Sequence, residues 1–286
     1  MRVVSLFPAA TEIVAALGAG GWLVGVSHEC DYPPAVQALP RVTRSTLDAA
    51  LSSREIDQQM AAAKSGGAAP VTVDLEALEH LRPDVIIGQS LCDVCAVDVG
   101  AQQAASLLAA LPSHPRVVTL HAHDLAGVFD DIGKVGEALD LRSEAEELVA
   151  GLRYRLRRVG AQHAAPLHRP RVLVVEWLDP PYVAGHWVPE LVTAAGGVDV
   201  GARAGDRSVT RAWADLRALA PEVVVVALCG FDVPRARREL AAVTDPDALA
   251  LLAGARVGFL DGNAYTSRPG PRLVEAVELL APLIGG

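Results

Sequence analysis

Each of the four cysteines follows an apolar run that predicts a buried strand, and a histidine accompanies the first of them. These residues are His28, Cys30, Cys92, Cys95 and Cys229. In open parallel sheets, ligands bind beyond the carboxyl ends of the strands. Thiolates and imidazoles at such an edge are suited to bind zinc, iron or cobalt. We therefore expect this edge to carry the chemistry of the protein.

The spacing Cys92-x-x-Cys95 has three interpretations. It fits a site for zinc or iron, or a direct contact to the metal of a ligand, completed by His28 and Cys30 from the adjacent strand end. It also fits a redox-active pair of thiols. The third interpretation is that small cysteine side chains pack at the end of a strand. The sequence leaves all three open.

Aromatic residues are scarce, with four each of Trp, Tyr and Phe, and most lie in or beside the expected loops at this edge. They are Phe7, Tyr32, Trp177, Tyr182, Trp187, Trp213, Phe231 and Tyr265. Large side chains gathered in loops are typical of a binding surface for a flat apolar ligand. The alternative is that they fill a hinge between two parts of the chain.

The elements that position these residues occur twice along the chain. Apolar runs without alternation predict strands covered on both faces, and they alternate with helical patterns. The expected strands lie at 2–6, 22–27, 85–89 and 116–124, and again at 171–177, 198–201, 223–227 and 256–264. The repeat predicts an α/β protein with two Rossmann-like lobes and parallel sheets. One larger doubly wound domain is the alternative.

A single long helix is predicted over Ser143–Gln162, between the two lobes. Ser143 and Glu146 have the spacing of a capping box, and apolar residues recur every three or four positions after them. About 20 residues form a rod of roughly 30 Å. The expected parts are an N-terminal lobe at 1–120, a helical connector at 121–164 and a C-terminal lobe at 165–286.

Residues 43–74 form a stretch without clear periodicity inside the first lobe. Ser52 and Glu55 are spaced to cap one short helix within it, over Ser53–Lys64. Long irregular stretches inside compact domains tend to be lids or binding loops. We expect this stretch to be irregular apart from the helix.

Composition and charge exclude several classes of protein. Lysine and arginine number 25 against 34 acidic residues, and the net charge of −9 argues against a nucleic-acid partner. No apolar run reaches the roughly 18 residues of a membrane span. The first strand begins at once, with no signal-peptide core and no lipid-attachment cysteine, so we expect a cytoplasmic location. A periplasmic location is the alternative if an export signal has been removed.

Several motifs together resemble the helical-backbone (class III) substrate-binding proteins of ABC importers, over nearly the whole chain. The motifs are SLFPAATEIVAALG at 5–18, DYPP at 31–34, LEALEHLRPDVII at 75–87, DPPYVAG at 179–185, LRALAPEVVVV at 216–226 and SRPGPR at 267–272. They are most similar to the vitamin B12 branch. The resemblance implies a non-catalytic protein that holds a large planar metal macrocycle between two lobes. Cobalamin or a related corrinoid is the first expectation, and haem or a ferric siderophore the second.

The resemblance also implies roles for single residues. Tyr32, Tyr182, Tyr265 and Arg268 match positions that contact the ligand in the family. The sequence contains no nucleophile elbow, phosphate loop or dinucleotide fingerprint, so we expect no enzyme. A cytoplasmic enzyme that uses a metal or thiol of the Cys/His cluster is the alternative.

Docking on a transporter is implied only in part. Family members dock through one acidic residue on each lobe, and Glu76 matches the first, seven residues before Pro83. Ala214 holds the equivalent position before Pro221 in the second lobe. We therefore expect a cytoplasmic relative that binds or hands over its ligand, with an ABC importer as a possible partner.

Overall fold

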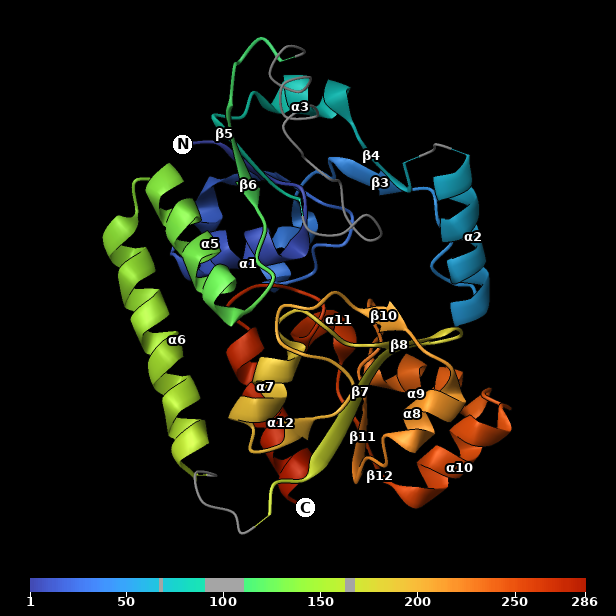
Figure 1. Cartoon of the computed structure of the whole chain (residues 1–286). Coiled ribbons are helices and arrows are strands. Elements are labelled where there is room, and N and C mark those ends of the chain that lie inside the picture. Colours follow the sequence, from blue (N-terminus) through green and yellow to red (C-terminus); the bar gives the residue numbers. More distant parts are fainter. Residues whose placement is uncertain (67–68, 91–110, 163–167) are drawn as a thin grey trace. The chain divides into compact units, whose positions relative to one another are not determined.

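The computed structural model describes residues 1–66, 69–90, 111–162 and 168–286, and the chain divides into two compact units (Figure 1). The first unit comprises residues 1–50, 58–122 and 126–151. The second comprises residues 51–57, 123–125 and 152–286. The chain therefore enters the second unit briefly at two points before it stays there.

The first unit is built on a parallel sheet of four strands in the order β2-β1-β5-β6. Its strands are β1 (Val3–Ser5), β2 (Leu23–Val26), β5 (Val85–Gln89) and β6 (Arg116–Leu120). Every residue of β1 and β5 is buried, as expected of inner strands of a parallel sheet that is covered on both faces. This is why their sequences show no alternation of apolar and polar residues.

Helices and turns of the first unit follow the predicted alternation with the strands. They are α1 (Pro8–Ala16), α3 (Leu75–Leu81) and α5 (Leu125–Ala138), with 3-10 turns η1 (Gly20–Trp22) and η2 (Pro34–Ala38). Asp74 caps α3, since its side chain accepts the backbone N–H of Ala77 at 3.0 Å. Leu78 of α3 packs against Val4 and Ile86 on one face of the sheet.

Residues 43–74 are more ordered than the sequence predicts. Strands β3 (Thr43–Ser45) and β4 (Val71–Val73) form an antiparallel pair at the two ends of this stretch, so the expected irregularity is wrong there. The predicted helix is confirmed as α2 (Ser53–Ser65). Its capping box forms as expected, because the backbone N–H of Ser52 donates to Glu55 Oε2 at 2.9 Å and Glu55 N–H donates to Ser52 Oγ at 3.4 Å.

The long helix α6 (Arg142–Gln162) confirms the predicted one within a residue. The carbonyl of Leu141 accepts the first helical hydrogen bond, from Ala145 N–H at 3.0 Å, so Leu141 rather than Ser143 is the N-cap residue. Ala145, Leu152 and Val159 are buried along one face, as the apolar spacing predicts. None of the helices in the described part of the chain is both long and apolar enough to span a membrane.

The second unit is built on a mixed sheet in the order β10-β8-β7-β11-β12, with β9 paired to β7. Its strands are β7 (Arg171–Leu178), β8 (Pro181–Val183), β9 (Val198–Asp199), β10 (Val209–Thr210), β11 (Val223–Val226) and β12 (Arg256–Phe259). Strands β7, β9, β11 and β12 are parallel, as predicted. The antiparallel strands β8 and β10 were not predicted, because each has only two or three residues.

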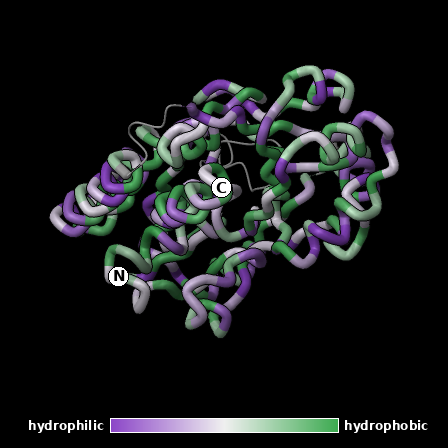
Figure 2. Tube along the Cα trace, turned by 90° about the horizontal axis from the view of Figure 1, so that it is seen from below, coloured by the Kyte–Doolittle hydropathy of each residue, from purple (hydrophilic) through white to green (hydrophobic). Residues whose placement is uncertain are grey.

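Helices cover both faces of this sheet, with α8, α9 and α10 on one side and α7 and α12 on the other (Figure 1). The helices are α7 (Val188–Ala194), α8 (Trp213–Ala218), α9 (Val233–Ala241), α10 (Pro246–Gly254), α11 (Gly262–Tyr265) and α12 (Leu273–Gly285). In Figure 2 the colours of the outer helical turns alternate between hydrophilic and hydrophobic, as expected of helices with one buried face. The predicted α/β fold class is confirmed in both units.

Candidate functional site

The carboxyl edge of the first sheet carries an oriented histidine. His28 follows β2, and its Nδ1 lies 2.7 Å from Thr43 Oγ1, which also accepts the backbone N–H of His28 at 2.9 Å. Thr43 donates its single hydroxyl hydrogen to Ser27 Oγ at 3.1 Å. Its oxygen must therefore accept the hydrogen bonds from the backbone nitrogen and from Nδ1 of His28. Nδ1 therefore carries the ring hydrogen, and Nε2 carries the lone pair.

The environment of His28 keeps the imidazole neutral at neutral pH. Burial lowers the pKa of His28, and the positive charge of Arg41 lowers it further. Arg41 also fixes the loop after β2, since its guanidinium donates to the carbonyl oxygens of Ser27 and Cys30 at 3.0 and 2.8 Å. A neutral imidazole with its Nδ1–H engaged is the state that binds a metal through Nε2.

Cys30 and Tyr32 follow His28 on the same loop but differ in exposure. Cys30 is 1% exposed, and its Sγ lies 3.1 Å from Thr11 Oγ1 inside the first unit. Tyr32 is 43% exposed. The structure therefore offers the tyrosine ring to a ligand directly, whereas the thiol of Cys30 is covered. The earlier aromatic on this edge, Phe7, is 4% exposed and is also covered.

The prediction that Cys30 and Cys92 lie at neighbouring strand ends assumed a strand order that the structure contradicts. The sequence suggested that the strands before Cys30 and Cys92 are neighbours, but β1 lies between β2 and β5. Two strand spacings of about 4.8 Å therefore separate the two strand ends. Cys92 and Cys95 themselves lie outside the described residues, so their role stays a prediction. The described residues contain no group of three or more His, Cys, Asp or Glu side chains that could hold a metal ion.

In the second unit, an aromatic pair lies at the carboxyl ends of the two central strands β7 and β11. Trp177, near the end of β7, and Phe231, which follows β11, have ring centroids 5.2 Å apart. Tyr182 of β8 pairs directly with Trp177 across the hairpin. The guanidinium of Arg235 lies 3.6 Å from the ring centroid of Phe231. Cys229 lies close by on the backbone, since its N–H donates to the carbonyl of Glu176 at 2.9 Å.

A second group follows β12 and holds two more predicted residues. Arg268 is 5% exposed, and its guanidinium donates to Asn263 Oδ1 at 2.9 Å. Tyr265 lies under the guanidinium of Arg272, 4.7 Å from the ring centroid. One guanidinium therefore lies beside the tyrosine after β12, and the second is buried against Asn263.

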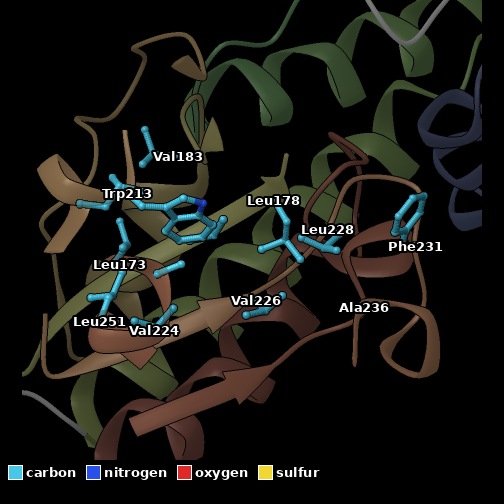
Figure 3. Packing of buried hydrophobic residues seen from close by; sticks show 13 residues of the cluster. Leu173, Leu178, Val183, Trp213, Val224, Val226, Leu228, Phe231, Ala236 and Leu251 are labelled. Atoms are coloured by element: carbon cyan, nitrogen blue, oxygen red, sulfur yellow. The ribbon is translucent and has the colours of Figure 1, made fainter. Parts of the chain in front are cut away.

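The two remaining predicted aromatics are packing residues in this structure. Trp187 is 4% exposed, and its indole N–H donates to the carbonyl of Thr266 at 2.8 Å. Trp213 is 7% exposed within the core of the second unit, where it packs with residues such as Leu173 and Val224 (Figure 3). Their contact with a ligand stays a prediction.

Sequence reasoning gave no role to a histidine pair of the second unit. The rings of His123 and His186 have centroids 5.9 Å apart, and His186 has a left-handed backbone with φ of 53°. Burial lowers the pKa of His186, and the nearby His123 and Arg207 lower it further. Within the described residues, His186 Nδ1 is buried without a hydrogen bond. No spacing in the sequence marks this pair.

The predicted docking residue lies on the surface of the first unit. Glu76 is the second residue of α3 and is exposed, and Ala214 is the second residue of α8 and is exposed. The two positions are therefore equivalent in their helices, and the second one lacks a carboxylate. The role of Glu76 in docking stays a prediction.

Comparison with known proteins decides the family. The sequence profile of the periplasmic binding proteins matches residues 3–238. The chain belongs to the periplasmic binding protein family. It is 27% identical to the vitamin B12-binding protein of Vibrio cholerae, over 97% of this chain and 86% of that protein. The predicted family is thereby confirmed.

Solved structures of this family have the same fold. The crystal structure of a periplasmic haem-binding protein from Pseudomonas aeruginosa matches with a TM-score of 0.73 and 25% identity, over 100% of this chain and 93% of that one. The periplasmic vitamin B12-binding protein of Vibrio cholerae matches with a TM-score of 0.70 and 21% identity, over 99% and 96% of the two chains. Both likenesses extend over the whole chain, so they concern both units.

Proposed function

We propose that this protein is a non-catalytic binding protein for a large planar metal macrocycle, with cobalamin or a related corrinoid first and haem second. The observation that carries the proposal is the likeness over 97% of the chain to a protein named for vitamin B12 binding. The likeness to a haem-binding protein at 25% identity supports the same class of ligand and keeps haem as the alternative. Both ligands are flat metal macrocycles.

The side chains at the carboxyl edges of the two sheets suit such a ligand. The ring of Tyr32 in the first unit is exposed, and Trp177 and Tyr182, paired in the second unit, are partly exposed aromatic rings. Arg268 is 5% exposed, so its guanidinium would first have to turn from Asn263 before it could meet polar groups at the rim of a macrocycle.

His28 is the residue we propose as a ligand of the macrocycle metal. Its ring hydrogen is engaged by Thr43, so Nε2 has the lone pair that cobalt or iron requires. Cys30 would first have to leave its buried contact with Thr11. The described residues thus fit coordination by one imidazole better than coordination by a cluster of thiolates.

Absorbance spectroscopy tests the proposal directly. The purified protein is incubated with hydroxocobalamin or haemin and desalted, and the retained chromophore is measured. Retention of one of them, with a spectrum that His28→Ala changes, is the expected result. A ligand present at 100 times its Kd should also raise the free energy of unfolding by about 2.7 kcal/mol. If neither chromophore is retained and neither stabilises the protein, the proposal is wrong.

Two further predictions concern the setting in which the protein works. A partnership with an ABC importer through Glu76 and a cytoplasmic location both stay proposals. Fractionation of cells that produce the natural protein would test the location. Co-purification of the protein with an importer, and its loss on Glu76→Ala, would test the partnership.

A further inference from the structure

A short segment from the first part of the chain packs within the second unit. Residues Leu51–Asp57, which we name the cover segment, belong to the second unit, although the residues before and after them belong to the first. The segment contains the first turn of α2, drawn in light blue in Figure 1. Its contacts join residues that are far apart in the sequence, so no local pattern predicts them.

Ser53 makes the central contact of the cover segment. Its backbone N–H and its Oγ both donate to Glu239 Oε2 of α9, at 3.1 and 2.7 Å. Ser53 is 2% exposed. An N–H in the first turn of a helix has no partner within the helix, and a carboxylate at this end also suits the helix dipole. Glu239 therefore serves as a cap for α2 that comes from elsewhere in the chain.

Three further contacts hold the ends of the cover segment. The guanidinium of Arg235 donates to the carbonyl of Leu51 at 2.7 Å. Arg54 pairs with Asp179 at 2.7 Å, and both of these side chains are largely exposed. Ile56 is the apolar anchor, since it packs against the core of the second unit.

The cover segment lies against the aromatic pair of the proposed ligand surface. The indole N–H of Trp177 donates to the carbonyl of Ser53 at 3.2 Å. Trp177 in turn contacts Phe231, over which Arg235 lies. Arg235, which holds Leu51 of the segment, is thus the same residue that lies over Phe231.

The way in which the cover segment is held makes it separable from the second unit. Its helical turn is capped by its own Ser52 and Glu55, so its shape does not depend on Glu239. Its attachment is mainly polar, and an exposed pair such as Arg54 with Asp179 contributes little. Ile56 adds an apolar contact. A ligand that stacks on an aromatic pair can compete with such contacts.

We infer that the cover segment occludes the outer part of Trp177, which packs on the buried Phe231, and must leave it before a planar ligand can stack on Trp177. This inference rests on the proposed function and adds regulation to the same site. Departure of the segment exposes the edge of Trp177 and the side chains of Arg235 and Glu239. The surface uncovered is the ring of Trp177 beside the Arg235–Glu239 ion pair, which offers an aromatic face and polar groups to a flat macrocycle.

Glu239→Ala removes the acceptor of both Ser53 hydrogen bonds and tests the inference. Hydrogen exchange of the amides of residues 51–57 should become about tenfold faster in the ligand-free variant. The association rate of haemin or hydroxocobalamin, measured by stopped-flow absorbance, should rise by about the same factor. Ser53→Ala should act in the same direction with a smaller effect. In Ser53→Ala, which leaves Glu239 and Arg235 in place, the dissociation rate should stay unchanged, because the segment is displaced in the bound state.

Arg217→Gln is the matched control, because it breaks an exposed ion pair with Asp247 elsewhere in the second unit. It should change neither the exchange of residues 51–57 nor the association rate. Unchanged exchange in Glu239→Ala, or faster exchange with an unchanged association rate, would overturn the inference. A faster dissociation rate in Ser53→Ala would also overturn it, since the segment would then hold the ligand in place. If neither ligand binds any of these proteins, the proposed function fails, and the gating role fails with it.

Discussion

Asp199 gives the sharpest test of the energetics in the second unit. It is the last residue of β9, and its Oδ1 accepts the backbone N–H groups of Gly201 and Ala202 at 2.8 and 3.0 Å. Its Oδ2 is buried, and within the described residues it has no hydrogen-bond partner. A carboxylate in this position is poorly solvated on one side. We expect the stability of Asp199→Asn, measured as its free energy of unfolding, to increase relative to that of the wild type as the pH rises.

The magnitude follows from the pKa of the carboxyl group. Burial raises the pKa of Asp199 from its ordinary value of 3.8 to about 6, against the opposing effect of the two N–H donors. Because the folded-state pKa is the higher one, the contribution to stability is complete below the unfolded pKa and is lost as the pH rises through about 6. Two pKa units correspond to about 3 kcal/mol.

Asn at this position stays neutral at every pH and keeps an oxygen for the two N–H groups. Its NH₂ group would be buried where Oδ2 was, at a cost of about 1–3 kcal/mol if no acceptor is near. That cost does not depend on pH. The difference in the free energy of unfolding between the variant and the wild type should therefore shift by about 2.4 kcal/mol in favour of the variant between pH 4 and 8, because pH 4 already lies just above the unfolded pKa.

Urea denaturation at a series of pH values measures this difference directly. Asp206→Asn is the matched control, since Asp206 is an exposed carboxylate of the same unit. The control should give a difference that changes little over the same range. A difference for Asp199→Asn that is flat from pH 4 to 8 would show that the buried carboxyl group is not the source of the pH dependence.

Two other substitutions test the packing of the second unit. Leu216→Ala removes a fully buried side chain of α8 and should lower the free energy of unfolding by about 2–5 kcal/mol, whereas the exposed Leu249→Ala should change it by less than about 0.5 kcal/mol in urea denaturation. Glu278 accepts two hydrogen bonds from the guanidinium of Arg155, at 3.0 and 2.7 Å, and both side chains are about one third exposed. Glu278→Gln weakens this pair and should lower the free energy of unfolding by about 1 kcal/mol at pH 7. Arg155 lowers the pKa of Glu278, so this cost should disappear as the pH falls below 4.5, and a cost that is equal at pH 7 and pH 3 would contradict the assignment.

The elements with a long or strong pattern could be predicted from the sequence. Strand β5 has the predicted bounds, Val85–Gln89, and α6 differs from its prediction by one residue. An unbroken apolar run and a repeated spacing of three and four residues are local signals that burial enforces. Strands β3, β8 and β10 have two or three residues each and exist through their partners. No local signal in the sequence could reveal them.

The candidate site could be predicted only as a set of residues near one edge. The sequence placed Trp177 and Trp213 in the same class of loop aromatics, but Trp213 begins α8 and packs into the core while Trp177 stays partly exposed. The contact of Ser53 with Glu239 joins residues 186 positions apart. Such contacts depend on how elements fold against one another, which spacing along the chain does not encode.

The order of the strands decides where a ligand site can form, and the sequence does not contain it directly. The chain places β2 on one side of β1 and then returns to place β5 on the other side. Ligands bind at the carboxyl ends of the strands where the order reverses in this way. In the second unit the equivalent reversal lies between β7 and β11, where Trp177 and Phe231 meet. The aromatic pair therefore lies at the position that the fold itself favours for a ligand. In this structure the cover segment lies against Trp177 of that pair.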